Sequence, residues 1–135
     1  MAGRYLDTDC ILALIKESDW LKSDVQKALH DDQRNYTSIL TLVESKLVIS
    51  REEERDSIHD LSDLIKAMNI ELLPMDQEVE RISNQLIRKY DFLGIFDSIH
   101  AATANINDLT MVSTDHIFPL MEELSVIDPR YISPN

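Results

Sequence analysis

Short apolar stretches alternate with longer segments of helical periodicity along this chain, and that alternation restricts the fold more than any other feature. Strands are predicted at residues 4–7, 35–39, 70–74, 110–113 and 125–128. Helices are predicted at residues 10–18, 19–32, 40–53, 53–69, 76–91, 97–106 and 116–124, in a chain with only two glycines and four prolines. Strands that alternate with helices are typical of α/β folds. We therefore expect a three-layer α/β/α domain with a central parallel β-sheet of short strands.

The length, charge and cysteine content limit where and how the chain can act. Its 135 residues are expected to form a single domain, residues 1–135, because half that length would bury little core. A net charge of −12 argues against a protein that binds nucleic acid through an overall basic surface. A bound divalent cation could nevertheless make the electrostatic potential positive locally. The single cysteine, Cys10, cannot form an internal disulfide. With no apolar leader and no membrane-length segment, a cytoplasmic protein is expected.

Four acidic residues stand near the predicted carboxyl ends of the strands, where open α/β sheets bind their ligands. Asp7 ends the first predicted strand and Asp115 follows the fourth, whereas Glu44 and Asp97 lie on helices. Each has a simpler role open to it, because aspartate is a common helix N-cap and Glu44 could point outward to a basic residue such as Lys46. Four coincidental structural roles are a weaker explanation than one shared pocket, so we expect the four acids to meet.

Carboxylates gathered at one sheet edge repel each other, and their pKa values rise unless positive charge arrives. Mg²⁺ or Mn²⁺ would supply that charge, because hard cations prefer oxygen ligands, and such an ion can activate water to attack a phosphodiester. Thr8 and Ser113 could orient the carboxylates through their hydroxyl groups or serve simply as turn residues. The residues themselves therefore favour metal-assisted hydrolysis of a phosphate ester.

The order of these residues resembles the PIN domain family, which includes the VapC toxin ribonucleases, over nearly the whole chain. That family opens with a strand that ends in Asp-Thr or Asp-Ser before an apolar helix, as at Asp7 and Thr8. Glu44 matches the family's acid on a helix entered through Ser or Thr, and Asp97 matches its acid at the start of an Ala-rich helix. No single match is specific, but the order and spacing together are.

The closing pattern of the family is a strand, a Ser or Thr, an Asp and soon a Phe, which Ser113, Asp115 and Phe118 match. Two departures leave the ligand set open. Asp9 rivals the acid two residues before it as the first ligand, and Ile117 stands where many members have a further acid. The number of bound metal ions therefore stays undecided at this point.

The resemblance implies a Mg²⁺- or Mn²⁺-dependent endoribonuclease that hydrolyses RNA phosphodiester bonds as the toxin of a toxin–antitoxin pair. The implied catalytic and metal-holding residues are Asp7, Glu44, Asp97 and Asp115, with Thr8 and Ser113 in supporting positions. The resemblance also implies a homodimer that a cognate antitoxin protein holds inactive.

Two other interpretations compete with this one. Asp7 and Asp9 also resemble the Asp-x-Asp start of haloacid-dehalogenase-type phosphatases, where they would be nucleophile and general acid, but the Gly-Asp motif of that family is missing. A non-catalytic PIN-like interaction module would use the acids as caps and the helices as a partner surface. The four histidines are scattered, which argues against a zinc site, and His100 is expected to serve in helix packing.

Overall fold

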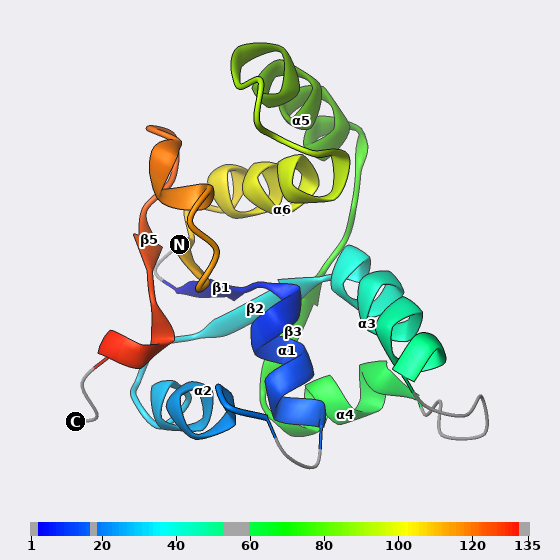
Figure 1. Ribbon diagram of the computed structural model, residues 1–135, viewed down its shortest axis with the longest axis vertical. Coiled ribbons are helices and arrows are strands. Elements are labelled where there is room, and N and C mark those ends of the chain that lie inside the picture. Colours follow the sequence, from blue (N-terminus) through cyan, green and yellow to red (C-terminus); the bar gives the residue numbers. More distant parts are fainter. Residues whose placement is uncertain (1–2, 17–18, 53–59, 133–135) are drawn as a thin grey trace.

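The computed structural model describes residues 3–16, 19–52 and 60–132, and a five-stranded sheet runs through its centre (Figure 1). The strands are β1 (Arg4–Leu6), β2 (Asn35–Ser38), β3 (Ile70–Leu73), β4 (Thr110–Val112) and β5 (Val126–Ile127). They lie in the order β3-β2-β1-β4-β5, and all neighbouring strands are parallel. The predicted parallel sheet of short strands is confirmed.

Six helices cover the two faces of the sheet in the described part of the chain. They are α1 (Thr8–Ile15), α2 (Lys22–Ala28), α3 (Ile39–Glu52), α4 (Leu61–Ala67), α5 (Gln77–Lys89) and α6 (Ile95–Ile106). Figure 1 shows α5 and α6 on one side of the sheet, α1, α2 and α4 on the other, and α3 beside the end of β2. The predicted three-layer α/β/α arrangement is confirmed.

Alternation along β1 explains why the sheet needs a helix layer on each face. Tyr5 belongs to the apolar cluster under α5 and α6, whereas the next residue, Leu6, belongs to the cluster under α1, α2 and α4. Successive side chains of a strand point to opposite faces, so two buried neighbours require cover on both sides. On α6, Ala101, Ala102 and Ala104 have no exposed surface, and their small side chains let that helix lie close to the sheet.

Two predicted helices differ from those in the structure. The helix predicted at residues 53–69 is present as α4, which begins at Leu61 because the Asp60 side chain caps it by accepting from the Asp63 backbone; residues 53–59 lie outside the described residues. The helix predicted at residues 116–124 is only a 3₁₀ turn, Phe118–Leu120. Met121 adopts an extended backbone there and is buried in the core, so tertiary packing overrides the local helical pattern.

The sheet places its carboxyl ends where three polar segments meet. β1 leads directly into α1, β2 into α3, and β4 into a loop that starts at Ser113. α6 adds its first two turns to the same region, because Glu44 of α3 contacts His100 of α6. Among the helices of the described ranges, none has both the length and the apolar character that crossing a bilayer requires.

Candidate active site

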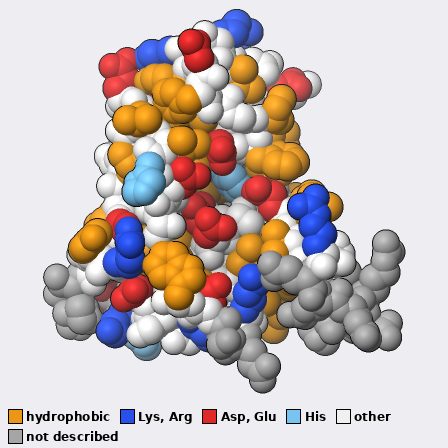
Figure 2. Space-filling model, in the orientation of Figure 1, with side chains coloured by type: hydrophobic (Ala, Val, Ile, Leu, Met, Phe, Trp, Pro, Cys, Tyr) orange, Lys and Arg blue, Asp and Glu red, His pale blue; other side chains and the backbone are white. Residues whose placement is uncertain are grey.

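A small pocket lies at the carboxyl edge of β1 and β4, and the predicted acids line it. Its volume is about 130 Å³, and its lining residues are Asp7, Thr8, Asp9, Glu44, Asp97, His100, Asp115 and Phe118. Figure 2 shows acidic side chains gathered in a hollow near the centre of this face, with a histidine among them. The structure therefore brings together Asp7, Glu44, Asp97 and Asp115, as well as Thr8.

Asp7 serves both as a helix cap and as a pocket residue. Its Oδ1 accepts a hydrogen bond of 3.1 Å from the Cys10 backbone N–H and so caps α1. Its Oδ2 accepts from the Ser113 hydroxyl, which in turn accepts from the Asp115 backbone N–H at 3.0 Å. Ser113 does not line the pocket, but it connects two acids that do.

Burial sets the charge state of Asp7. Only 5 % of this residue is exposed, and burial raises the pKa of its carboxyl to about 6, with a further upward push from the neighbouring Asp9 carboxylate. The hydrogen bonds from Ser113 and Cys10 act in the opposite direction but do not restore the ordinary value. Asp7 therefore exchanges its proton near neutral pH, where a cation can displace it.

Glu44 points into the pocket rather than outward to a basic neighbour such as Lys46. Its Oε1 accepts a 2.7 Å hydrogen bond from the Thr8 hydroxyl and a second one from Nε2 of His100. Burial alone would raise the pKa of Glu44, but these two hydrogen bonds outweigh burial and hold the pKa below its ordinary value. The carboxylate is therefore kept ionised and fixed in direction.

His100 is a pocket residue whose contacts the sequence reasoning missed. It is buried, as expected for helix packing, but its ring also connects three elements. Nδ1 lies 2.6 Å from the Tyr5 hydroxyl of β1, and that hydroxyl lies 2.7 Å from Oγ of Ser38 at the end of β2. One signal could have found it: His100 follows Asp97 by three residues, which puts both on the same face of α6.

The carboxylates of the remaining acids repel each other across the pocket. Burial raises the pKa of Asp97, the carboxylates of Asp115, Glu44 and Asp9 raise it further, and His100 opposes them. Burial, Asp115 and Glu44 likewise raise the pKa of Asp9. Asp7 and Asp9 both line the pocket, so their positions do not decide which of the two would be the metal ligand from this segment.

The donor set fits a hydrated, hard divalent cation better than a fully protein-bound ion. Within the described ranges, no group of three Asp, Glu, His or Cys side chains is arranged to hold one metal ion. Mg²⁺ does not require such a group, because it keeps several waters and binds through one or two carboxylates. A volume of about 130 Å³ has room for roughly four waters. The mutual repulsion of the acids favours the arrival of positive charge.

Asp7→Asn should stabilise the metal-free protein above neutral pH. A pKa of about 6 in the folded state, against an ordinary value of 3.8, means that the folded protein holds a proton that the unfolded chain releases. The Asp7 carboxyl therefore costs no stability below pH 3.8; the cost grows as the pH rises from 3.8 to about 6 and keeps its full value above that. We expect the variant to gain up to ~3 kcal/mol at pH 8 and to converge with wild type near pH 4.

Urea unfolding in EDTA across this pH range measures the difference. Asp91→Asn, which removes one exposed charge outside the pocket, is the matched control and should show no comparable pH dependence. A constant difference between Asp7→Asn and wild type from pH 4 to pH 8 would contradict the raised pKa.

Comparison with known proteins gives the family of the chain. The family model of the PIN domain matches residues 4–124. No protein of curated function matches the chain in sequence. Three solved structures illustrate the similarity in fold. One, a toxin–antitoxin complex from Klebsiella pneumoniae, is 20% identical, with a TM-score of 0.72, and the match covers 96% of this chain and 100% of that one.

The other two structures are similarly distant in sequence and close in fold. FitAcB from Neisseria gonorrhoeae is 23% identical with a TM-score of 0.72, and the match covers 98% of this chain and 100% of that one. VapC20 from Mycobacterium tuberculosis, described as a sarcin-ricin loop cleaving toxin, is 12% identical with a TM-score of 0.74, over 87% of this chain and 94% of that one. The match to the family model spans most of the sequence, and the acids of the family pattern line one pocket. The chain belongs to the PIN domain family.

Proposed function

We propose that this protein is a Mg²⁺- or Mn²⁺-dependent endoribonuclease and the toxin of a toxin–antitoxin pair. The observation that carries the proposal is the shared pocket of Asp7, Glu44, Asp97 and Asp115 in a PIN domain. Two of the similar structures support it, since one is described as a sarcin-ricin loop cleaving toxin and another as a toxin–antitoxin complex. The free, buried thiol of Cys10 suits a reducing cytoplasm, where we propose that the protein works.

One or two of the four acids would hold a hydrated divalent ion directly, the others would act through its waters, and the surrounding side chains would orient them. Such an ion, when bound, supplies a water of lowered pKa and neutralises charge that builds on the phosphodiester. Thr8 keeps one Glu44 oxygen in place, and Ser113 does the same for Asp7. With a net charge of −12, the protein repels RNA until a cation is present, so RNA binding itself should depend on the metal.

Asp97→Asn should abolish RNA cleavage while leaving the fold intact, because it removes one pocket charge without changing shape. We expect Mg²⁺-dependent cleavage of a transfer and ribosomal RNA pool to fall by at least about 100-fold. Calorimetric titration with Mn²⁺ should show binding to wild type and much weaker binding to Asp97→Asn and Glu44→Gln. Gel analysis of the RNA, with and without EDTA, provides the activity measurement.

Asp91→Asn again provides the matched control, since it removes an equal charge from an exposed position outside the pocket. It should bind Mn²⁺ and cleave RNA like wild type. Undiminished cleavage by Asp97→Asn would rule out its proposed role. Wild-type protein that neither binds Mn²⁺ nor cleaves any RNA would favour the non-catalytic interaction module instead.

We further propose that His100 is a positioning residue for Glu44. A neutral ring that donates from Nε2 to Glu44 accepts at Nδ1 from the Tyr5 hydroxyl, and Ser38 can donate to Tyr5. Burial raises the pKa of Tyr5, so this hydroxyl keeps its proton and can act as the donor. This chain of hydrogen bonds runs from β1 and β2 to Glu44 and would fix the orientation of its carboxylate. Such indirect partners of a metal ligand typically change affinity or activity by about 10–100-fold.

His100→Leu should lower both Mn²⁺ affinity and kcat by about 10–100-fold, with little change in the KM for RNA. His100→Gln, whose amide can still donate to Glu44, should recover most of that loss. Mn²⁺ titration and cleavage kinetics of the two variants measure the effect, and thermal unfolding checks that both fold. Equal losses in the two variants would point to a merely structural role.

An apolar stripe on α3 supports the proposed homodimer. Ile39, Val43 and Leu47 follow each other at four-residue spacing and are 41–48 % exposed. Residues four apart share one helix face, so the three side chains form a continuous apolar strip beside the pocket helix α6. Contiguous exposed apolar surface marks protein interaction sites. We propose that two copies of the chain meet here and that a cognate antitoxin protein inhibits the dimer.

Val43→Lys should convert the dimer to a monomer, because it puts a charge in the centre of the stripe. Light scattering at micromolar concentration measures the change in mass, with thermal unfolding as the check on folding. Gln85→Lys, on an exposed position of α5, is the control and should leave the dimer intact. A monomeric wild type would refute this proposal.

A further inference from the structure

A second cavity, which we call the side cavity, adjoins the candidate active site next to α1 and the start of α2. Its volume is about 180 Å³. Asp9 lines both the side cavity and the acidic pocket, and Thr114, which precedes the pocket residue Asp115, lines the side cavity. A nucleic-acid strand with one phosphate at the acidic pocket could therefore place a neighbouring nucleotide in this space.

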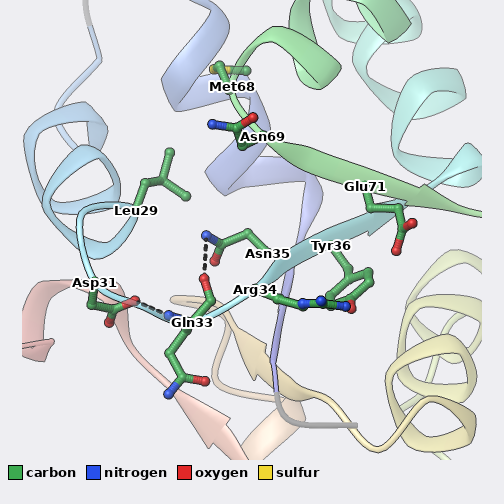
Figure 3. Close-up of a pocket in the computed structure, with 9 residues that line it drawn as sticks. All are labelled: Leu29, Asp31, Gln33, Arg34, Asn35, Tyr36, Met68, Asn69 and Glu71. Atoms are coloured by element: carbon green, nitrogen blue, oxygen red, sulfur yellow. Dashed lines mark hydrogen bonds between the residues drawn. The ribbon is translucent and has the colours of Figure 1, made fainter.

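A larger cavity does not have this position. It has a volume of about 430 Å³ and opens at the amino-terminal ends of β2 and β3, at the opposite edge of the sheet (Figure 3). It shares no lining residue with the acidic pocket. Asn35 lines it, but Oδ1 of that residue is buried, so a ligand there could not donate to this oxygen. Of the two cavities, the side cavity is the one that a substrate at the acidic pocket can reach.

Trp20 gives the side cavity an exposed aromatic wall. The residue is 69 % exposed, whereas the next residue, Leu21, is buried in the core under α1 and α2. The Leu21 backbone N–H also donates a hydrogen bond of 2.9 Å to Oδ1 of Asp19, so the chain is fixed on both sides of Trp20. The protein therefore holds this large ring at its surface. Tryptophan in such a position is typical of binding sites, because its ring offers a large contact area.

A cation already contacts the Trp20 ring and restricts its position. Cζ of Arg130 lies over the ring, 5.8 Å from its centre. The guanidinium is itself held by Asp128, through hydrogen bonds of 3.0 Å from Nε to Oδ1 and 2.5 Å from Nη2 to Oδ2. Cation–π contacts of this kind are attractive, and the high exposure of Trp20 shows that its ring keeps open surface. Trp20 is thus a preorganised platform on which a flat group can stack.

Lys16 brings positive charge to the same cavity. It is the C-cap residue of α1, and its ammonium group is near enough to Asp9 to oppose the rise in the pKa of that carboxyl. Figure 2 shows basic and hydrophobic side chains on this face of the molecule, below the acidic hollow. Because lysine commonly contacts backbone phosphates, Lys16 is suited to the phosphate of a strand that passes from the acidic pocket to the exposed ring.

These features together select one unpaired nucleobase as the occupant. Sites for drug-sized ligands have volumes of about 300–1,000 Å³, so the smaller side cavity suits a single ring system better than a folded peptide segment. Proteins hold single-stranded nucleic acid by stacking bases on aromatic side chains and by placing positive charge along the backbone. Trp20 and Lys16 provide these two contacts beside the acidic pocket.

We propose that Trp20 stacks one unpaired base of the RNA, next to the phosphate at the acidic pocket, and that Lys16 contacts the backbone of the same strand. Stacking tolerates any base, because every base has a flat face. A base inside a duplex has both faces covered by its neighbours, so the site would favour unpaired RNA. This inference rests on the proposed nuclease function and deepens it by naming the form of RNA that the site accepts.

The fluorescence of Trp20 reports stacking directly, because the chain has no other tryptophan. Rapid mixing of the full chain in Mg²⁺ with a short single-stranded RNA should quench this fluorescence before the strand is cleaved. An abasic strand of the same length should leave the fluorescence nearly unchanged, and so should the same RNA annealed to its complement. Neither of these offers an unpaired base to the ring.

Trp20→Ala should raise the Kd for the single strand about 5- to 150-fold and leave the Kd for the abasic strand unchanged. Rapid-mixing anisotropy of labelled RNA measures both values. Trp20→Phe, which keeps an aromatic ring, should recover most of the loss. Phe92→Ala removes an exposed aromatic side chain that lines neither the acidic pocket nor the side cavity, and it should bind like wild type. Thermal unfolding checks that all three variants fold.

Cleavage assays on the same proteins separate this inference from the nuclease proposal. Cleavage by wild type without quenching, or equal affinity of wild type and Trp20→Ala for the single strand, would overturn this inference alone and leave the exposed ring to a protein partner. Equal losses of affinity for the single and abasic strands would overturn it too, because Trp20 would then not act on a base. Quenching without cleavage would refute the nuclease proposal while supporting base stacking, and the absence of both would overturn both proposals.

Discussion

The repulsion between acids at one edge of the sheet is the constraint on which the rest of the site depends. Asp7, Asp9 and Asp97 all have raised pKa values, because full or partial desolvation and the neighbouring carboxylates both disfavour their charged forms. The protein offsets this cost with aimed donors, of which the Ser113 hydroxyl and the His100 ring are the principal ones. These donors hold the acids in place in the absence of a cation, and a bound cation would reduce their mutual repulsion further.

The helix layer formed by α6 makes that arrangement geometrically attainable. Its fully buried alanines allow the helix to pack closely on the sheet, which brings Asp97 and His100 to the carboxyl ends of β1 and β2. A larger residue at Ala101 or Ala102 would push the helix outward and separate the acids. Packing and electrostatics therefore act together: core packing sets the distances between the pocket acids, and the hydrogen bonds set the orientation of their carboxylates.

Local patterns were sufficient for the strands and for the four acids, but not for every element. The strands at 4–7 and 70–74 were predicted nearly to the residue, because short apolar runs bounded by polar residues or proline are too short for a buried helix and are typical of buried strands. The helix expected at 116–124 is mostly absent, since burial of Met121 in the core outweighs its helical neighbours. The contacts of His100 with Glu44 and Tyr5 were missed, because helix packing explained this residue adequately from sequence alone.

The sequence by itself determined that strands alternate with helices and that acids follow the strands, because side-chain periodicity and carboxyl-end position are local properties. Only the tertiary structure decided which donors meet those acids. Glu44 and His100 are 56 residues apart, and no spacing rule connects residues on two different helices. That Oδ1 of Asn35 has no hydrogen-bond partner among the described residues is likewise visible only after folding, because hydrogen-bond satisfaction depends on the neighbours that packing supplies.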